Sequence, residues 1–259
     1  MTTAVHPRSW TGRAAAAGRQ ASRGWRTELL LFLAAYVVYN VARWVFVGDL
    51  PAAKDHARWI YGLEQDAGVA VEGSVQGALD AAPISFTLSN LYLAAQLVVV
   101  PATLVWLYRS SPPLYRQLRN TVVATWLLAV PVFALFPVAP PRLAGLGIAD
   151  TVSQQATVQL TGRSTIFYNQ LAAVPSLHVG FAVAVGVAVA YAVKPRWAKV
   201  LALMWGPIVS LSVVATGNHY VFDIATGLAV TALGFVVGRL VVKGLAARPL
   251  LAPAVAAGS

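Results

Sequence analysis

Six long apolar runs restrict the fold of this chain more than any other feature of its sequence. A helix that crosses a hydrocarbon core of ~30 Å needs roughly 20 mostly apolar residues, and each run approaches that length. Because lipid offers no partner for backbone polar groups, such runs cross a membrane as α-helices. The sequence therefore predicts an all-α, polytopic membrane protein, a bundle of six transmembrane helices. The runs cover residues 29–47, 87–108, 121–138, 177–193, 200–216 and 221–239.

Charged residues are scarce and divide by sign between the connections. They make up 11% of the chain, against about 25% in soluble domains. If the spans alternate, basic residues fill one set of connections (109–120 and 194–199) and both tails, while acidic residues fill the other (49–86 and 139–176). The positive-inside rule then puts both termini in the cytoplasm. We expect a multi-pass protein of a cell membrane, of the bacterial plasma membrane type.

The net charge of +10 also raises the question of nucleic-acid binding. Its placement in tails and short connections is the pattern of a membrane protein, so we expect no nucleic-acid partner. Cysteine is absent, which excludes a thiolate metal site and a thiol nucleophile.

The runs divide the chain into a six-span membrane domain, 28–243, between cytoplasmic tails, 1–27 and 244–259. Two expected outside segments exceed simple turns. Residues 49–86 have near-helical apolar spacing, which predicts either an interfacial helix anchored by Trp59 and Tyr61 or a cap that contacts substrate. The other segment, 139–176, leads directly to a histidine, and long loops of this kind are usually functional or disordered.

Two histidines and one carboxylate stand at the ends of apolar runs. AVPSLHVGFA contains His178, and GNHYVFDIATG contains His219 and Asp223. An ionisable group at the centre of a membrane helix costs roughly 2.5–3.5 kcal/mol or more, so groups retained there are usually functional. His219 and Asp223 are spaced i, i+4, so on one helix they share a face and can hydrogen-bond. In the expected topology all three residues meet at the outer membrane surface.

The residues around this trio can bind an anion. Ser176 is a good N-cap for a helix that begins just before His178, and a helix N-terminus presents unpaired N–H groups to phosphate. Arg142, in the Pro-Pro-Arg sequence after the third run, offers a planar cationic fork, and Arg163 is a second external arginine. Asn169 either orients a group of the loop or stabilises a turn. The candidate phosphate-binding residues are Arg142, Arg163, Asn169, Ser176 and Leu177.

PSLH followed by GNHYVFD resembles the second and third motifs of the type-2 phosphatidic acid phosphatase family, over roughly residues 28–243. The phrases FPVAPPRL and HYVFDIATG look most like its inositol phosphorylceramide synthase branch. The resemblance implies that His219 is the nucleophile, that Asp223 orients it, and that His178 acts as acid and then as base. It also implies a lipid phosphate or phospholipid substrate, handled through a phosphohistidine at the extracytoplasmic face without a metal or cofactor.

Three departures from the family pattern concern phosphate binding. Leu177 stands where the second motif usually has glycine, and Val213 where the third motif usually has arginine. The lysine and Arg-Pro of the first motif are absent as such, and Arg142 is their nearest substitute. Arg142 would then carry more of the phosphate charge, and the acceptor is either water or the hydroxyl of a polyol or lipid.

Two other readings of the same residues remain. Two histidines and a carboxylate form a conceivable metal site, although no further ligand is evident. A lipid-binding or transport protein could line a path with the histidines, but inverted repeats and interrupted helices, which favour transport, are not seen in the sequence.

The charge pattern predicts the sidedness of the loops. A cysteine introduced at Asp150 should react with an impermeant thiol reagent from outside intact cells, and one at Arg116 should not. Because the chain has no cysteine of its own, the label reports a single position. The reverse labelling pattern would place the histidine site on the cytoplasmic face.

Overall fold

The computed structural model describes residues 24–38, 41, 49–158 and 169–247. The chain forms two compact units, 1–44 and 45–259, and each is described by itself. In the first unit residues 24–38 are helical. The first expected span, 29–47, and the tails expected at 1–27 and 244–259 lie partly outside the described residues.

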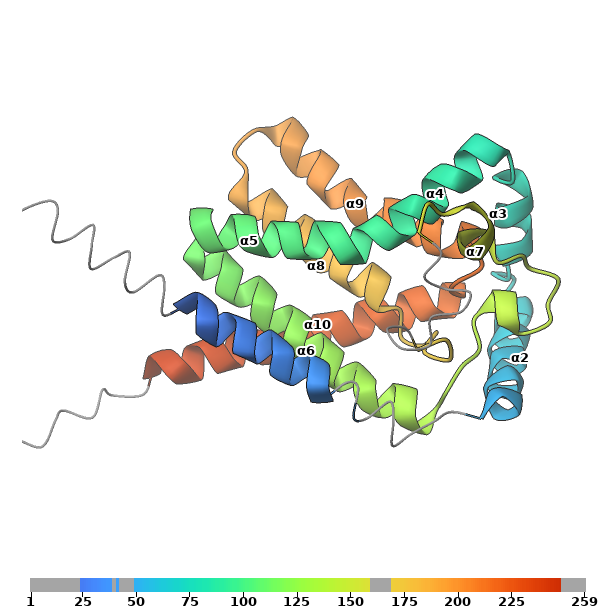
Figure 1. Cartoon of the computed structure of the whole chain (residues 1–259), viewed down its shortest axis with the longest axis horizontal. Helices are drawn as coiled ribbons and strands as arrows, with labels where there is room; N and C mark the ends of the chain where they lie inside the picture. Colours follow the sequence, from blue (N-terminus) through green and yellow to red (C-terminus); the bar gives the residue numbers. More distant parts are fainter. Residues whose placement is uncertain (1–23, 39–40, 42–48, 159–168, 248–259) are drawn as a thin grey trace, which may run out of the picture. The chain divides into compact units, whose positions relative to one another are not determined.

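The described part of the second unit is helical, as the apolar runs predicted (Figure 1). The π-helical turn η1 joins α4 to α5, and an isolated parallel bridge joins Val138 to Ala172. The elements are α2 (Leu50–Asp66), α3 (Glu72–Ala78), α4 (Ala82–Ala94), η1 (Ala95–Val99), α5 (Val100–Ser110), α6 (Pro112–Leu135), η2 (Pro141–Leu143), α7 (Thr151–Gln155), α8 (Leu177–Ala192), α9 (Arg196–Ala215) and α10 (Val221–Ala247).

Four helices among the described residues are long and apolar enough to cross a membrane. They match the runs expected at 87–108, 121–138, 200–216 and 221–239, with shifted ends. The run at 177–193 forms α8, which is apolar but only 16 residues long, or about 24 Å. The count of six spans therefore stays a prediction. The four spans are Ala82–Ser110, Pro112–Leu135, Arg196–Ala215 and Val221–Val241.

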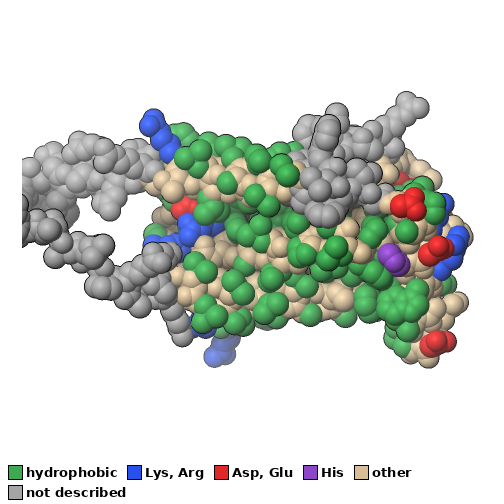
Figure 2. Space-filling model, turned by 90° about the horizontal axis from the view of Figure 1, so that it is seen from below, with side chains coloured by type: hydrophobic (Ala, Val, Ile, Leu, Met, Phe, Trp, Pro, Cys, Tyr) green, Lys and Arg blue, Asp and Glu red, His purple; other side chains and the backbone are tan. Residues whose placement is uncertain are grey.

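Polar connections gather at the two ends of this helical unit. The α5–α6 and α8–α9 turns lie at one end, and α2, α3, α7 and the α9–α10 turn lie at the other (Figure 1). Large apolar side chains such as Val98, Leu201 and Leu240 are about 60% exposed on the helices between. Figure 2 shows hydrophobic side chains along this middle region and acidic side chains at the α2 end. An apolar belt between polar ends is the surface of a membrane protein.

Glycines let α10 pack closely against two neighbouring helices. A Cβ added at Gly234 would meet the Oγ1 and backbone of Thr125 on α6, and one at Gly227 would meet the backbone of Ser176 at the start of α8. Small residues are common where membrane helices approach closely, because they bring the backbones into van der Waals contact. The contact at Gly227 fixes the N-terminus of α8 beside the first turns of α10.

Helix α2 is the helix expected within residues 49–86. Its buried residues Ala53, Ala57, Ile60 and Glu64 recur at i, i+4 and i+3 spacing and form one stripe. The apolar members of this stripe pack in one cluster with the chain after α6 and with Tyr220. Trp59, expected to be an interfacial anchor, is 56% exposed, and the position of α2 against a membrane stays a prediction.

The glycine contact between α6 and α10 predicts a stability difference. Gly234→Ala should lower the free energy of unfolding by about 1–3 kcal/mol, because the added methyl group overpacks against Thr125. Gly62→Ala in α2 is the control: its Cβ meets nothing within 4 Å, so helix propensity should make it neutral or stabilising. Thermal unfolding of the detergent-solubilised chain measures both, and equal midpoints would contradict the packing described.

Candidate active site

The turn between α9 and α10 carries His219. Gly217 has φ +68°, a left-handed conformation that favours glycine, and a Cβ there would lie 2.7 Å from the carbonyl oxygen of Ala149. The amides of Asn218 and His219 both donate to Val213 O, at 3.0 and 3.2 Å. Helix α10 begins at Val221, where the sixth apolar run begins, so His219 lies in the turn before the helix and does not share a helix with Asp223.

The pairing of His219 with Asp223 nevertheless forms. His219 Nδ1 lies 2.9 Å from Ala173 O and 3.1 Å from Asp223 Oδ2. A backbone carbonyl can only accept, so the proton is on Nδ1 and the lone pair is on Nε2. Asp223 Oδ2 also accepts from Tyr220 N–H at 2.9 Å, and Asp223 is completely buried. The imidazole is thus held in the tautomer that leaves Nε2 unprotonated.

His178 lies next to His219, as expected from the sequence. The ring centroids are 5.8 Å apart, with the planes tilted by 54°. The His178 ring also stacks on Tyr92 of α4, with centroids 4.1 Å apart and planes at 18°. His178 is the second residue of α8, so the start of that helix sets its position.

Ser176 is the N-cap of α8, as predicted. Its Oγ accepts from Val179 N–H at 3.4 Å, and its own amide donates to Asp223 O at 3.1 Å. The Ser176 amide is therefore already paired in this structure. Leu177 is the first helical residue, where an N–H has no partner within the helix itself.

Arg142 reaches the same turn from η2. Its amide donates to Gly217 O at 3.0 Å, and its Nε donates to Asn218 Oδ1 at 3.1 Å and lies 3.7 Å from Asp150 Oδ1. The side chain is 1% exposed, yet Nη2 has no hydrogen-bond partner within the described part of the chain. Arg142 therefore has an unused donor on a buried guanidinium, and it is bonded to Asn218, the residue before His219. Such a guanidinium can bind an anion.

The two remaining candidates are less informative. Asn169 Oδ1 accepts from Leu171 N–H at 3.1 Å, which is the turn-stabilising alternative. Arg163 lies outside the described residues.

Four residues of this region were missed from the sequence. Tyr92 stacks on His178, and Asn218 connects Arg142 to Thr216. Glu64 and Glu72 accept hydrogen bonds from the first amides of α10. Only Glu64 carried a signal: a carboxylate that continues the apolar stripe of a helix is expected to be buried and paired.

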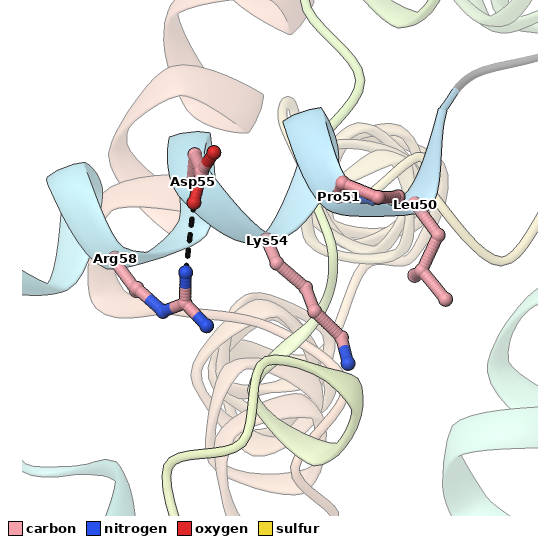
Figure 3. Close-up of a pocket in the computed structure, with 5 residues that line it drawn as sticks. All are labelled: Leu50, Pro51, Lys54, Asp55 and Arg58. Atoms are coloured by element: carbon pink, nitrogen blue, oxygen red, sulfur yellow. Dashed lines mark hydrogen bonds and ion pairs between the residues drawn. The ribbon is translucent and has the colours of Figure 1, made fainter.

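A surface pocket of about 260 Å³ lies elsewhere, on the first turns of α2 (Figure 3). Its lining includes Lys54 and the Asp55–Arg58 ion pair of 2.7 Å, and none of the candidate site residues. Among the described residues, no group of three or more His, Cys, Asp or Glu side chains is arranged to hold a metal ion.

One known protein family matches this chain. The family model of the PAP2 superfamily matches residues 58–237, more than half of the 259 residues, and the match includes every candidate site residue. Neither the curated proteins nor the solved structures gave a match. The chain therefore belongs to the PAP2 superfamily, and this membership supports a phosphatase-type lipid phosphoesterase in a membrane.

Proposed function

We propose that this protein is a membrane-embedded lipid phosphatase or phosphotransferase that works through a phosphohistidine at His219. One observation carries the proposal: two acceptors, Ala173 O and Asp223 Oδ2, hold the Nδ1 proton of His219. The lone pair of Nε2 is then available to phosphorus, beside a second histidine that can move a proton.

In the first step Nε2 of His219 attacks the phosphorus of a lipid phosphoester. The bond between phosphorus and the leaving oxygen breaks, and His178 donates a proton to that oxygen. The His219 ring gains positive charge as the P–N bond forms, and the Asp223 carboxylate, 3.1 Å from Nδ1, stabilises that charge.

In the second step His178 accepts a proton from the hydroxyl of the acceptor. The acceptor oxygen attacks phosphorus, the P–N bond breaks, and His219 returns to its starting state. His178 can serve both steps because its ring lies beside His219 while Tyr92 stacks on its face.

Arg142 and the first turn of α8 stabilise the phosphoryl oxygens in this proposal. The free Nη2 of Arg142 and the amide of Leu177 supply donors where transition-state charge develops. Ser176 contributes indirectly, since its amide is bonded to Asp223 O and its hydroxyl caps the helix. Arg163 is a further candidate cation.

One position supports the phosphate-binding role of Arg142. It is position 213, where the resemblance leads us to expect an arginine. Val213 stands there, completely buried in an apolar cluster with Tyr92, Val179 and Val209. That position offers no cation and no room for solvent. Arg142 therefore carries more of the phosphate charge in this chain than in the pattern that it resembles.

The acceptor is water in a phosphatase and an alcohol in a transferase. Leu177, Val213 and the FPVAPPRL segment favour the second candidate, transfer of a phosphate-containing head group to a polyol such as inositol or to a lipid alcohol. That segment joins α6 to η2 and pairs with the chain before α8, through Val138 N–H to Leu171 O at 2.9 Å. The segment thus connects Arg142 to the stretch of chain that contains Ala173, whose carbonyl oxygen accepts from His219 Nδ1.

The site lies at the acidic end of the helical unit, with α2, α3 and α7 (Figure 1). The positive-inside rule assigns that end to the extracytoplasmic side, since Arg109, Arg116 and Lys194 lie in the opposite connections. We therefore propose that the lipid reacts at the extracytoplasmic face.

His219→Ala should abolish turnover and leave no acid-labile phosphohistidine after quenching, because it removes the nucleophile. Asp223→Asn should lower turnover by about 10³–10⁴-fold, because the amide cannot stabilise the charged ring. Rapid-quench labelling with a radioactive lipid phosphate measures both. Full turnover in His219→Ala would reject the mechanism.

Incubation with a panel of lipid phosphates and phospholipids tests the function itself. Mass spectrometry of both products should show cleavage of a lipid phosphoester, with a product that changes when inositol or another polyol is supplied. Rapid release of free phosphate, unaffected by any alcohol, would decide for a plain phosphatase. No cleavage of any lipid in the panel would contradict both forms of the proposal.

A further inference from the structure

Two glutamates from outside the proposed triad bind the start of α10. Glu64 Oε1 accepts from Phe222 N–H at 2.6 Å, and Glu72 Oε1 accepts from Val221 N–H at 3.0 Å. These two amides lie between His219 and Asp223 in the sequence. Since a helix leaves its first N–H groups unpaired, acceptors here fix the direction in which α10 begins.

The carboxyl groups of this glutamate pair are buried and close together. Glu64 is 3% exposed and Glu72 is fully buried, and their carboxyl groups lie close together because they accept from the amides of adjacent residues. The second oxygen of each, Oε2, has no hydrogen-bond partner in the described part of the chain, and no Lys or Arg there forms an ion pair with either. Two adjacent buried carboxylates cannot both remain ionised without a large free-energy cost.

One shared proton accounts both for the unpaired Oε2 atoms and for two buried carboxyl groups that have no cationic partner. A proton between the two carboxyls gives the unpaired oxygens a donor and an acceptor, and it removes one of two like charges. The Oε1 atoms meanwhile continue to accept from Val221 and Phe222.

We propose that Glu64 and Glu72 share one proton and act together as positioning residues, holding the first turn of α10 so that Asp223 meets His219. The inference rests on the proposed function for its effect on turnover, but not for the shared proton. Neither glutamate touches the reacting atoms. They act through the backbone at Val221 and Phe222, two residues from His219 on one side and one from Asp223 on the other.

The shared proton gives the pair a pH dependence. Burial, followed by the charge of Glu72 on α3 and of Asp223 on α10, raises the pKa of Glu64 to about 8 from its usual 4.5. Tyr220 and Tyr61 are the other titratable groups that face this cluster. The folded state binds a proton that the unfolded state releases, so the stability contribution is full below pH 4.5 and declines up to about pH 8.

Glu64→Gln is the central variant. Its amide can still accept from Phe222 and donate to Glu72, and it has no proton to lose. The unfolding midpoint is measured on the full chain in detergent. Raising the pH from 5 to 8 should lower the midpoint of the unaltered protein by roughly 5 °C more than it lowers that of Glu64→Gln. Asp55→Asn is the matched control, the same chemical change at an exposed carboxylate of α2 (Figure 3). It should follow the unaltered protein at every pH.

Turnover adds the positioning test. The turnover of the unaltered protein should decline above pH 8. Glu64→Gln should keep at least half of the turnover at pH 7 and should not show that decline. Glu64→Ala should lose tenfold or more at every pH, because Phe222 N–H loses its acceptor. If Glu64→Ala fails to fold, an infrared carboxylic acid band at pH 6 that is absent in Glu64→Gln still supports the shared proton.

Identical pH dependence of unfolding in the unaltered protein, Glu64→Gln and Asp55→Asn would overturn the shared proton. Unchanged turnover and pH profile in a folded Glu64→Ala would overturn the positioning role. If no lipid is cleaved by any form of the chain, the proposed function fails while the unfolding and infrared measurements still decide the proton.

Discussion

Asp223 Oδ2 accepts two hydrogen bonds from within one turn of chain, from His219 Nδ1 at 3.1 Å and from Tyr220 N–H at 2.9 Å. Both bonds depend on where α10 begins, because Asp223 lies in its first turn. The carboxylate is completely buried, so water cannot compete for it. Together with Ala173 O, it determines which nitrogen of His219 carries the proton, and the proposed chemistry follows from that choice.

The surrounding structure holds this turn from three directions. Gly227 lets Ser176 approach α10, so the helix that carries His178 starts beside Asp223. The chain after α6 brings Arg142 to Gly217 and Asn218. Helices α2 and α3 supply the glutamates that bind Val221 and Phe222. Each contact joins segments far apart in sequence, so the site is a product of the whole fold of the helical unit.

The sequence predicted the parts of this arrangement that have local causes. Apolar runs predicted four of the long helices, Ser176 predicted the start of α8, and the spacing of His219 and Asp223 predicted their bond. The spacing argument assumed one continuous helix, whereas the bond forms across a turn that Gly217 makes possible. Tyr92, Asn218 and Glu72 could not be predicted, since their roles depend on which distant segment packs beside them.

The protonation of His219 tests the account most directly and needs no substrate. ¹⁵N NMR of histidine-labelled protein, with His219→Gln to assign the signal, reports which ring nitrogen is protonated at neutral pH. The account predicts a protonated Nδ1 and a bare Nε2, since Nδ1 faces Ala173 O and Asp223 Oδ2. A proton on Nε2 with a bare Nδ1 would contradict the geometry from which the nucleophile was inferred.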